Sequence, residues 1–383
     1  MNRKFRISGF QFFCLIFLFE MGSSSLIALA SSAKQDAWIS MIIAMIVGAI
    51  LFSVYIKLYE MYPDIPFTKY IQEILGKYPG KILAIIYIIY FIYIGGRVLR
   101  DFEELLVISL YNATSLITIG MLMMFLVMYA IFKGFETFVR LNEVSFYIIL
   151  LIVITVIGFE IIAKLIKLDN LKPVLENGWI PVIQSAFPLT VTFPFGEIIT
   201  FTMFMPYLKK TEIAKKVGLP AMAFAGLTLT VIAIVNIAIL GTSVVERATY
   251  PILTAVSYIN IANFIQRLDS LIVIVMVLGG FIKITVFFFC AVLGAADLFK
   301  VKKTDTLTYP IAVIMVIISV WMAPNFLEHY KEGLDIVPYY LHIPLQIVLP
   351  FLLLVIALIQ KKGKANENAN EKANTSTNEN AAQ

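Results

Sequence analysis

The sequence predicts an all-α integral membrane protein whose ten transmembrane helices form two inverted halves of five, with helices one and six broken. Three observations predict this fold. Of the 383 residues, 60% are apolar and only 14% are charged, whereas a soluble domain carries about 25% charged residues. The charges collect between long uncharged windows, and crossing a bilayer takes roughly 20 apolar residues. The first and sixth windows carry matching interruptions, which is typical of inverted repeats.

The same composition excludes a water-soluble enzyme, a nucleic-acid-binding protein and a disordered chain. Both cysteines, Cys14 and Cys290, lie in apolar windows, so no disulfide framework is expected. Neither histidine, His329 or His342, is near a second candidate ligand or a nucleophile in the sequence. No phosphate loop, metal-spaced Cys/His set or G-x-S-x-G motif occurs. We therefore expect no enzymatic activity, no cofactor and no metal.

The predicted spans differ in how many charges they contain. The second, fourth, seventh, ninth and tenth are clear apolar windows, and the third, fifth and sixth contain one or a few charges. The first is interrupted only by Glu20 and the eighth only by Lys283. The first window is too long for a signal peptide and has no small-residue cleavage site. The spans cover approximately residues 7–33, 37–59, 81–110, 113–132, 143–166, 182–208, 217–242, 269–298, 306–323 and 337–360.

The basic residues predict the orientation, because cytoplasmic loops carry an excess of Lys and Arg. Of the 30 Lys and Arg residues, 20 fall on the N-terminal side of the ten-span arrangement and seven on the other side. Arg97, Arg100 and Lys283 remain inside or near helices. Both termini are therefore expected in the cytoplasm. The tail 361–383 is rich in Asn, Ala and Glu and is expected to be disordered.

The long connections between spans also correspond in the two halves. Spans two and three are joined by residues 61–80, and spans seven and eight by residues 243–268. Within the second connection, residues 252–268 are too polar to cross the membrane. They predict a helix lying at the membrane surface.

The interruptions in spans one and six each place a glycine beside a glutamate. Span one contains the run FEMGSSS at 19–25, and span six contains FPFGE at 193–197. Pro194 removes a backbone donor, and Gly22 followed by three serines favours an unwound turn. Such turns expose N–H groups for a carboxylate and carbonyls for an ammonium, as at the substrate site of a secondary transporter. Packing is the alternative role of Gly22, since glycines in membrane helices often serve packing.

Two charged residues lie near the middle of their spans. Glu20 and Lys283 each have 13 uncharged residues on both sides, where a charge costs at least about 2.5–3.5 kcal/mol. Either they pair with each other, or Lys283 faces the two breaks, its ammonium replacing a coupling cation. A purely structural ion pair is the alternative. Glu197 is expected to contact ligand, accept a proton or cap the second half-helix.

The third span carries further polar residues toward its predicted outer end. Its five charges indicate a water-facing vestibule or a subunit contact; they are Arg97, Arg100, Asp101, Glu103 and Glu104. Tyr90 and Tyr93 lie deeper on the same helix and are candidates to line a ligand cavity. Packing is their alternative role.

Several short motifs occur along the chain up to about residue 360. They are Ile7-Ser8-x-x-Gln11, Gly22-Ser23-Ser24-Ser25-Leu26, LKPVLxxG at 171–178, Phe195-Gly196-Glu197, Tyr250-Pro251-Ile252, FIQRLD at 264–269 and Phe281-Ile282-Lys283. Together these motifs resemble the B subunit of spore nutrient-germinant receptors, the endospore germination permeases. Gln266 and Met276 depart from the family, which often has an acidic residue and a tryptophan there; both differences concern local detail.

The resemblance implies a LeuT-like fold of the amino acid–polyamine–organocation transporter superfamily, located in the inner membrane of a spore. It implies a complex with an A-type membrane subunit and a lipoprotein C subunit, and binding of a small germinant, typically an amino acid. The implied ligand site comprises Gly22, Ser23 and Ser24 on helix one, Tyr90 and Tyr93 on helix three, Phe193, Pro194, Phe195 and Gly196 on helix six, and Lys283 on helix eight.

Two other functions stay open at this level. One is a proton-coupled amino-acid permease that uses Glu20, Glu197 or Lys283 as its charge relay, and the other is a ligand-gated ion-conducting component. All three functions need a midplane site and a switchable water path, so the sequence does not separate them. Lys283 beside the site would suit a carboxylate, unless Glu20 neutralises it.

Overall fold

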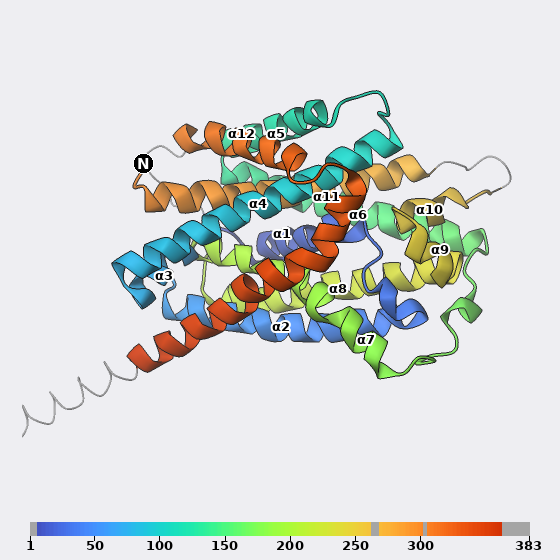
Figure 1. Ribbon diagram of the computed structural model, residues 1–383, viewed down its shortest axis with the longest axis horizontal. Coiled ribbons are helices and arrows are strands. Elements are labelled where there is room, and N and C mark those ends of the chain that lie inside the picture. Colours follow the sequence, from blue (N-terminus) through green and yellow to red (C-terminus); the bar gives the residue numbers. More distant parts are fainter. Residues whose placement is uncertain (1–5, 262–267, 302–304, 362–383) are drawn as a thin grey trace, which may run out of the picture.

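The computed structural model describes residues 6–261, 268–301 and 305–361, and it is helical throughout, with helices running mostly along its long axis (Figure 1). Short 3-10 and π turns lie between the helices. The predicted disordered tail lies outside the described residues apart from Lys361. The α-helices are α1 (Gly9–Met21), α2 (Ala37–Met61), α3 (Phe67–Leu75), α4 (Lys77–Ser109), α5 (Leu116–Phe132), α6 (Phe135–Ile162), α7 (Trp179–Ser185), α8 (Glu212–Leu240), α9 (Thr242–Arg247), α10 (Pro251–Ser257), α11 (Asp269–Leu298), α12 (Asp305–Trp321) and α13 (Phe326–Lys331).

Seven helices in the described part of the chain are long and apolar enough to cross a membrane. An eighth span results if the pair Thr306–Trp321 and Phe326–Ile336, bent by 107°, is counted as one. The helix Leu116–Phe132 is apolar but shorter. An all-helical protein with many membrane spans is therefore confirmed. The count of ten stays a prediction.

The connection after α8 differs in part from its prediction. The predicted surface helix over 252–268 is helical as α10 only to Ser257, and Tyr258–Ile261 is not helical. The Ser257 hydroxyl donates to the Thr254 carbonyl at 2.7 Å, and such local bonds compete with helix continuation. Residues 262–267 lie outside the described residues.

Two sets of hydrogen bonds hold the start of α1 in place. Ser8 and Gln11 form a capping box, in which the side chain of each accepts from the backbone N–H of the other. Just before it, the Ile7 N–H donates to the Tyr207 carbonyl at 2.8 Å, and the Lys209 N–H donates to the Ile7 carbonyl at 3.1 Å. The start of α1 is thus bonded to the segment that follows the sixth predicted span.

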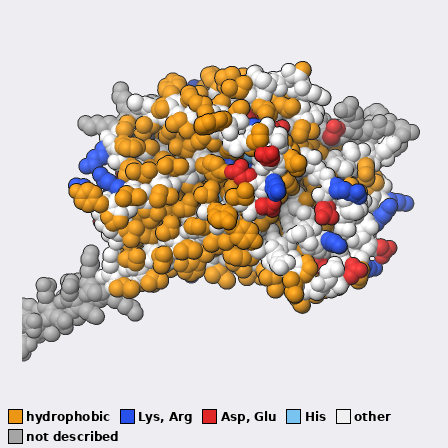
Figure 2. All heavy atoms as spheres, in the orientation of Figure 1, with side chains coloured by type: hydrophobic (Ala, Val, Ile, Leu, Met, Phe, Trp, Pro, Cys, Tyr) orange, Lys and Arg blue, Asp and Glu red, His pale blue; other side chains and the backbone are white. Residues whose placement is uncertain are grey.

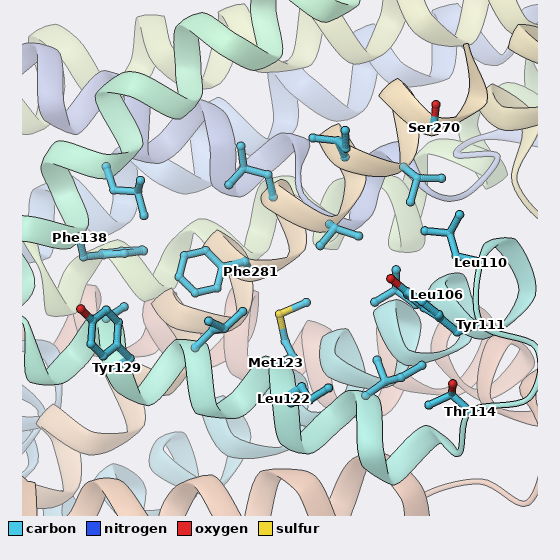
Figure 3. A pocket seen from close by; sticks show the side chains of 18 of the residues that line it. Leu106, Leu110, Tyr111, Thr114, Leu122, Met123, Tyr129, Phe138, Ser270 and Phe281 are labelled. Carbon is cyan, nitrogen blue, oxygen red and sulfur yellow. The ribbon is translucent and has the colours of Figure 1, made fainter. Parts of the chain in front are cut away.

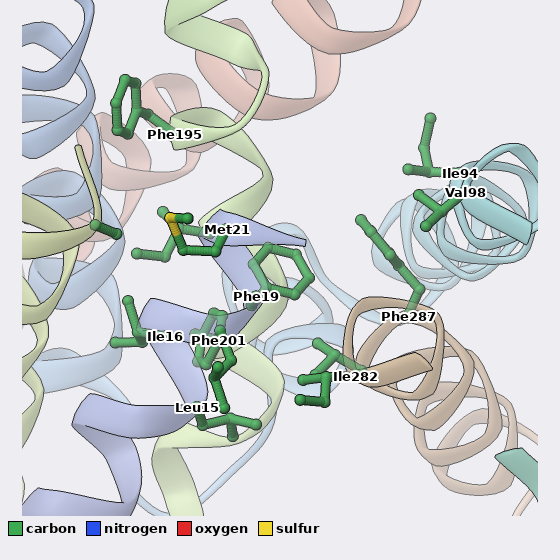
Figure 4. Close-up of a cluster of buried hydrophobic side chains, with 14 of the residues drawn as sticks. Leu15, Ile16, Phe19, Met21, Ile94, Val98, Phe195, Phe201, Ile282 and Phe287 are labelled. Carbon is green, nitrogen blue, oxygen red and sulfur yellow. The ribbon is translucent and has the colours of Figure 1, made fainter. Parts of the chain in front are cut away.

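The far end of α1 lies in the centre of the core. The Phe19 ring packs against Phe201 and Phe287, with ring centroids 5.3 and 5.4 Å apart. Figure 4 shows these rings together, with Ile94 and Val98 of α4 facing Phe287 of α11. All five side chains are buried. Because α1 is surrounded by other helices, its charged residue, Glu20, is fully buried.

The outer surface is apolar over a broad band. Figure 2 shows hydrophobic side chains covering much of the visible face, with charged side chains at its left edge and over its right part. Large apolar side chains such as Ile82, Leu151 and Ile162 are exposed on the protein surface. An exposed apolar area of this extent would aggregate in water. It indicates the surface that contacts lipid.

Several helices approach each other closely at glycines. A Cβ at Gly280 of α11 would overlap the ring of Phe102 on α4, and one at Gly48 of α2 would overlap Phe195. A Cβ at Gly96 of α4 would crowd Ile318 of α12. Small residues at such contacts let membrane helices gain van der Waals packing.

Gly280→Ala is expected to destabilise the protein by about 1–3 kcal/mol, because the added methyl group overpacks the interface between α4 and α11. The matched control is Gly158→Ala on α6, where no atom of the described residues lies within 4 Å of the added carbon. Thermal unfolding in detergent measures the difference. A melting temperature of Gly280→Ala equal to that of the control would contradict this account of the interface.

Candidate functional site

The end of α1 forms the first wall of the candidate site. The α-helix ends at Met21, Gly22 has φ −34° and ψ −105°, and Ser23–Ser25 (η1) form a 3-10 turn. A Cβ at Gly22 would lie 3.0 Å from Lys283 Cβ and 3.2 Å from the Gly279 carbonyl oxygen. Glycine is needed here because α1 ends directly against the backbone and side chain of α11.

The second wall comes from the segment Trp179–Met203. After α7, a π turn spans Ala186–Thr190 (η4), and a 3-10 helix spans Phe195–Met203 (η5), with turn residues at Phe193 and Pro194 between them. Glu197 lies in the first turn of η5. The positive end of a helix dipole stabilises a carboxylate at that position, and the negative end of α1 stabilises a nearby ammonium.

Lys283 forms an ion pair with Glu197. The Lys283 Nζ lies 2.6 Å from Glu197 Oε2, and the two side chains are 0% and 2% exposed. Lys283 therefore faces the sixth-span break, and its partner is Glu197, whereas the ion pairs among the described residues do not include Glu20.

Two aromatic rings cover the same ammonium. Lys283 Nζ lies 5.1 Å from the ring centroid of Phe19 and 4.5 Å from that of Phe193. Ring faces attract cations, and the attraction grows when water is excluded. The rings therefore hold the ammonium in place where solvent does not reach it.

Three polar side chains near the break lack partners. Both carboxylate oxygens of Glu20 and the hydroxyls of Ser23 and Ser24 are buried, without a hydrogen-bond partner among the described residues. Burying such groups unpaired costs free energy. They are available to a ligand or to water.

Tyr90 belongs to a small buried network with two residues of the last helix, Pro338–Lys361. Its Oη lies 2.8 Å from His342 Nδ1, and the Gln346 Nε2 donates to Tyr90 Oη at 2.7 Å. A Cβ at Gly196 would overlap the Gln346 amide oxygen. The network thus connects α4, the last helix and the break in the sixth predicted span.

Tyr93 belongs to a more peripheral network. Its hydroxyl donates to Glu332 Oε1 at 2.7 Å and accepts from Arg97 at 3.3 Å. Arg97 also donates to the His329 carbonyl at 2.6 Å, and His329 Nε2 lies 2.7 Å from Asp101 Oδ1. These bonds hold α4 against α13 and the turn that follows it.

A cavity of about 60 Å³ lies between the ion pair and this peripheral network. Its walls join predicted site residues to Arg97 and Asp101 of α4. The expected water-facing vestibule is not observed at the other three charges, because Arg100, Glu103 and Glu104 are buried. The lining residues are Ser23, Ile27, Ile94, Arg97, Val98, Asp101, Phe193, Glu197, His329, Tyr330, Gly333, Leu334, Val337 and His342.

Five of the twelve predicted site residues lie at or beside this cavity. Lys283 lies against Gly22, over the Phe193 ring and beside Glu197. Ser23 lines the cavity with Phe193 and Glu197.

The other predicted residues lie farther away. Tyr90 and Gly196 reach the cavity only through His342 and Gln346, and Tyr93 belongs to the peripheral network. Pro194 is the N-cap of η5, and Ser24 is buried on η1. Phe195 packs between Gly48 and Gly226, in contact with α2 and α8, so it serves packing.

The sequence reasoning missed three polar residues of this region, His329, His342 and Gln346. No motif marks them, and the two histidines had no partner nearby in the sequence. Their partners come from α4, more than 200 residues away. Their one sequence signal is a polar side chain in or beside an apolar span.

Two solved structures share the fold. The structure of Mhp1, a nucleobase-cation-symport-1 family transporter with bromovinylhydantoin bound, matches 86% of this chain and 75% of its own with a TM-score of 0.62 and 13% identity. A Na⁺-coupled sialic acid symporter matches 86% of this chain and 79% of its own with a TM-score of 0.64 and 11% identity. The chain therefore has a transporter fold.

Sequence relatives are more specific. A family model described as spore germination protein matches residues 6–327. The spore germination protein KB of Bacillus subtilis (strain 168) is 37% identical over 96% of this chain and 99% of its own length. The resemblance seen in the motifs is confirmed: the chain belongs to the family of spore germination proteins, as a B-type permease subunit.

Proposed function

We propose that this protein is the germinant-sensing B subunit of a spore nutrient receptor. It spans the spore inner membrane ten times in two inverted halves of five, with helices one and six broken and both termini in the cytoplasm. It binds a small nutrient, an amino acid, between the first, third, sixth and eighth spans, which correspond to α1, α4, the segment from α7 to η5, and α11. Binding is passed to an A-type membrane subunit and a C-type lipoprotein, and germination follows.

The observation that carries this proposal is the Lys283–Glu197 ion pair at the edge of the cavity. An amino acid is a zwitterion, with a carboxylate and an ammonium on neighbouring atoms. The Lys283 ammonium suits the carboxylate, and Glu197 suits the ammonium, so a ligand that enters between them exchanges one ion pair for two. The exchange keeps every buried charge neutralised, which a low-dielectric site requires.

The surroundings of the pair support this exchange. The hydroxyls of Ser23 and Ser24 have no partner among the described residues and are available to the ligand. A water molecule occupies about 30 Å³ in the liquid, so the cavity of about 60 Å³ is too small for an amino acid. Binding therefore requires the cavity to widen. Movement of α13 and the Arg97–Glu332 contact is the direct route, because these residues form its wall.

The coupled variants Lys283→Met and Glu197→Gln test the site. Either single change leaves one buried partner unpaired and is expected to reduce folding by about 3–5 kcal/mol, while the double variant removes both groups and recovers stability. The double variant is expected to lose at least about tenfold in ligand affinity. Thermal shifts of the purified protein across a panel of amino acids measure both effects.

The matched control for this pair is Glu212→Gln with Lys216→Met, an exposed ion pair of α8. It is expected to change neither stability nor affinity by a measurable amount. If the Lys283/Glu197 double variant folds and binds amino acids as wild type does, the pair is only structural and the site lies elsewhere.

Deletion of the gene in the spore former tests the sensing role. Spores without the protein are expected to lose germination on one class of nutrient in a screen of amino acids, sugars and nucleosides. The wild-type gene is expected to restore it, and the Lys283→Met/Glu197→Gln gene is not. Unchanged germination on every nutrient would contradict the receptor function.

A proton-coupled permease is the second candidate function, and Glu20 favours it. Its carboxylate is fully buried near the centre of the molecule, without a hydrogen-bond partner in the described part of the chain. An unpaired carboxyl group in a membrane helix is a common element of proton relays.

Uptake by purified protein in lipid vesicles separates the two functions. For a sensor, we expect binding of labelled amino acid without accumulation under a pH gradient. Accumulation that the gradient drives and Glu20→Gln abolishes would show a permease. Ligand-dependent current without uptake would show an ion-conducting component.

A further inference from the structure

A large apolar hollow lies on the membrane-facing side of the molecule, away from the candidate ligand site. Its volume is about 1070 Å³, and it lies between α5 and the facing sides of α6 and α11 (Figure 3). Met123 and Phe281 extend into it from α5 and α11. The lining residues are Leu106, Leu110, Tyr111, Thr114, Ile119, Leu122, Met123, Leu126, Tyr129, Ala130, Lys133, Thr137, Phe138, Leu141, Ser270, Val273, Ile274, Val277, Leu278 and Phe281.

The hollow is not filled by the protein's own side chains. Leu122 and Leu126 on α5 and Ile274 on α11 are exposed at its edges. Protein interiors are otherwise close-packed, and voids larger than a water molecule are few. In a membrane, an apolar space of this size between helices is filled by a hydrocarbon chain or by another helix.

A second hollow, of about 410 Å³, adjoins the first and is more polar than the first. Lys133 and Thr137 line both hollows, so the two spaces meet at these residues. Arg140 and Glu136 lie on the wall of the second hollow. The combined space is therefore apolar along α5 and cationic at the end where α5 passes into α6.

Lys133 is the positive charge that a ligand could reach where the two hollows meet. Among the described residues it forms no ion pair, and its Nζ lies 5.2 Å from the ring centroid of Tyr129. Arg140 is already paired with Glu136 at 2.6 Å. An ammonium at the membrane interface, beside an apolar hollow, complements a phosphate that carries acyl chains.

We propose that this hollow binds an anionic glycerophospholipid, with an acyl chain between α5 and α11 and the phosphate at Lys133. The position of Lys133 on the predicted cytoplasmic side agrees with this, because anionic lipid there attracts basic residues. A helix of a partner protein would satisfy the apolar part but leaves Lys133 without a counter-ion. The cationic end therefore favours lipid as the occupant.

Thermal unfolding of the purified full chain in detergent tests the proposal, with phosphatidylglycerol and phosphatidylcholine of identical chains as the added lipids. Phosphatidylglycerol is expected to raise the melting temperature more than phosphatidylcholine does. Lys133→Gln is expected to weaken the apparent phosphatidylglycerol affinity about fivefold, the effect of one interfacial charge, and to weaken phosphatidylcholine binding less, because the choline ammonium neutralises its phosphate.

Two further variants separate the headgroup from the chain. Lys57→Gln removes an exposed lysine outside both hollows and is expected to behave as wild type. Ala130→Trp fills the apolar hollow and is expected to weaken both lipids equally. Equal stabilisation by the two lipids in wild type, or no effect of Lys133→Gln, would overturn the proposal.

A photoreactive residue at Leu126 identifies the occupant in native membranes. Cross-linking is expected to add the mass of a phospholipid to the protein. A protein-sized adduct would show that a partner helix fills the hollow and would overturn the proposal.

Discussion

The buried ion pair between Lys283 and Glu197 is the interaction on which the centre of the molecule depends. A lysine near the middle of a membrane helix is tolerated only with a counter-charge and without lipid contact. Both conditions are met because α11, the end of α1 and the start of η5 converge on the ammonium. The interruption at Gly22 lets α1 end against α11, and η5 begins where its positive end stabilises Glu197.

Around this pair the molecule is built from two kinds of contact. Glycine contacts such as Gly280 against Phe102 bring the helices close and define a rigid frame. Polar contacts such as His329 to Asp101 close the cavity on one side, where α13 meets α4. The polar contacts can exchange partners with a ligand and the glycine contacts cannot.

Much of the membrane architecture follows from the sequence, since apolar windows and isolated charges are local features. Lys283 and the break at Gly22 are both recognisable there, and both lie at the site. The pairing of Lys283 with Glu197 was not predicted, because the sequence also offered Glu20, another charge near the middle of a span, as a partner. Phe195 was expected at the ligand site, and in the structure it packs against α2 and α8. The sequence does not show which side of a broken helix faces inward, so this contact was not predicted.

Hydropathy and charge spacing are enough to identify a helical membrane protein that carries charges near the middle of its spans. They are enough because the bilayer imposes one strong constraint on every segment. Which charged and polar groups meet depends on how the helices pack, and packing brings His342 and Gln346 to Tyr90 across some 250 residues of chain. The reason is physical. Desolvation penalises each buried charge separately, but its compensation depends on which helices pack together.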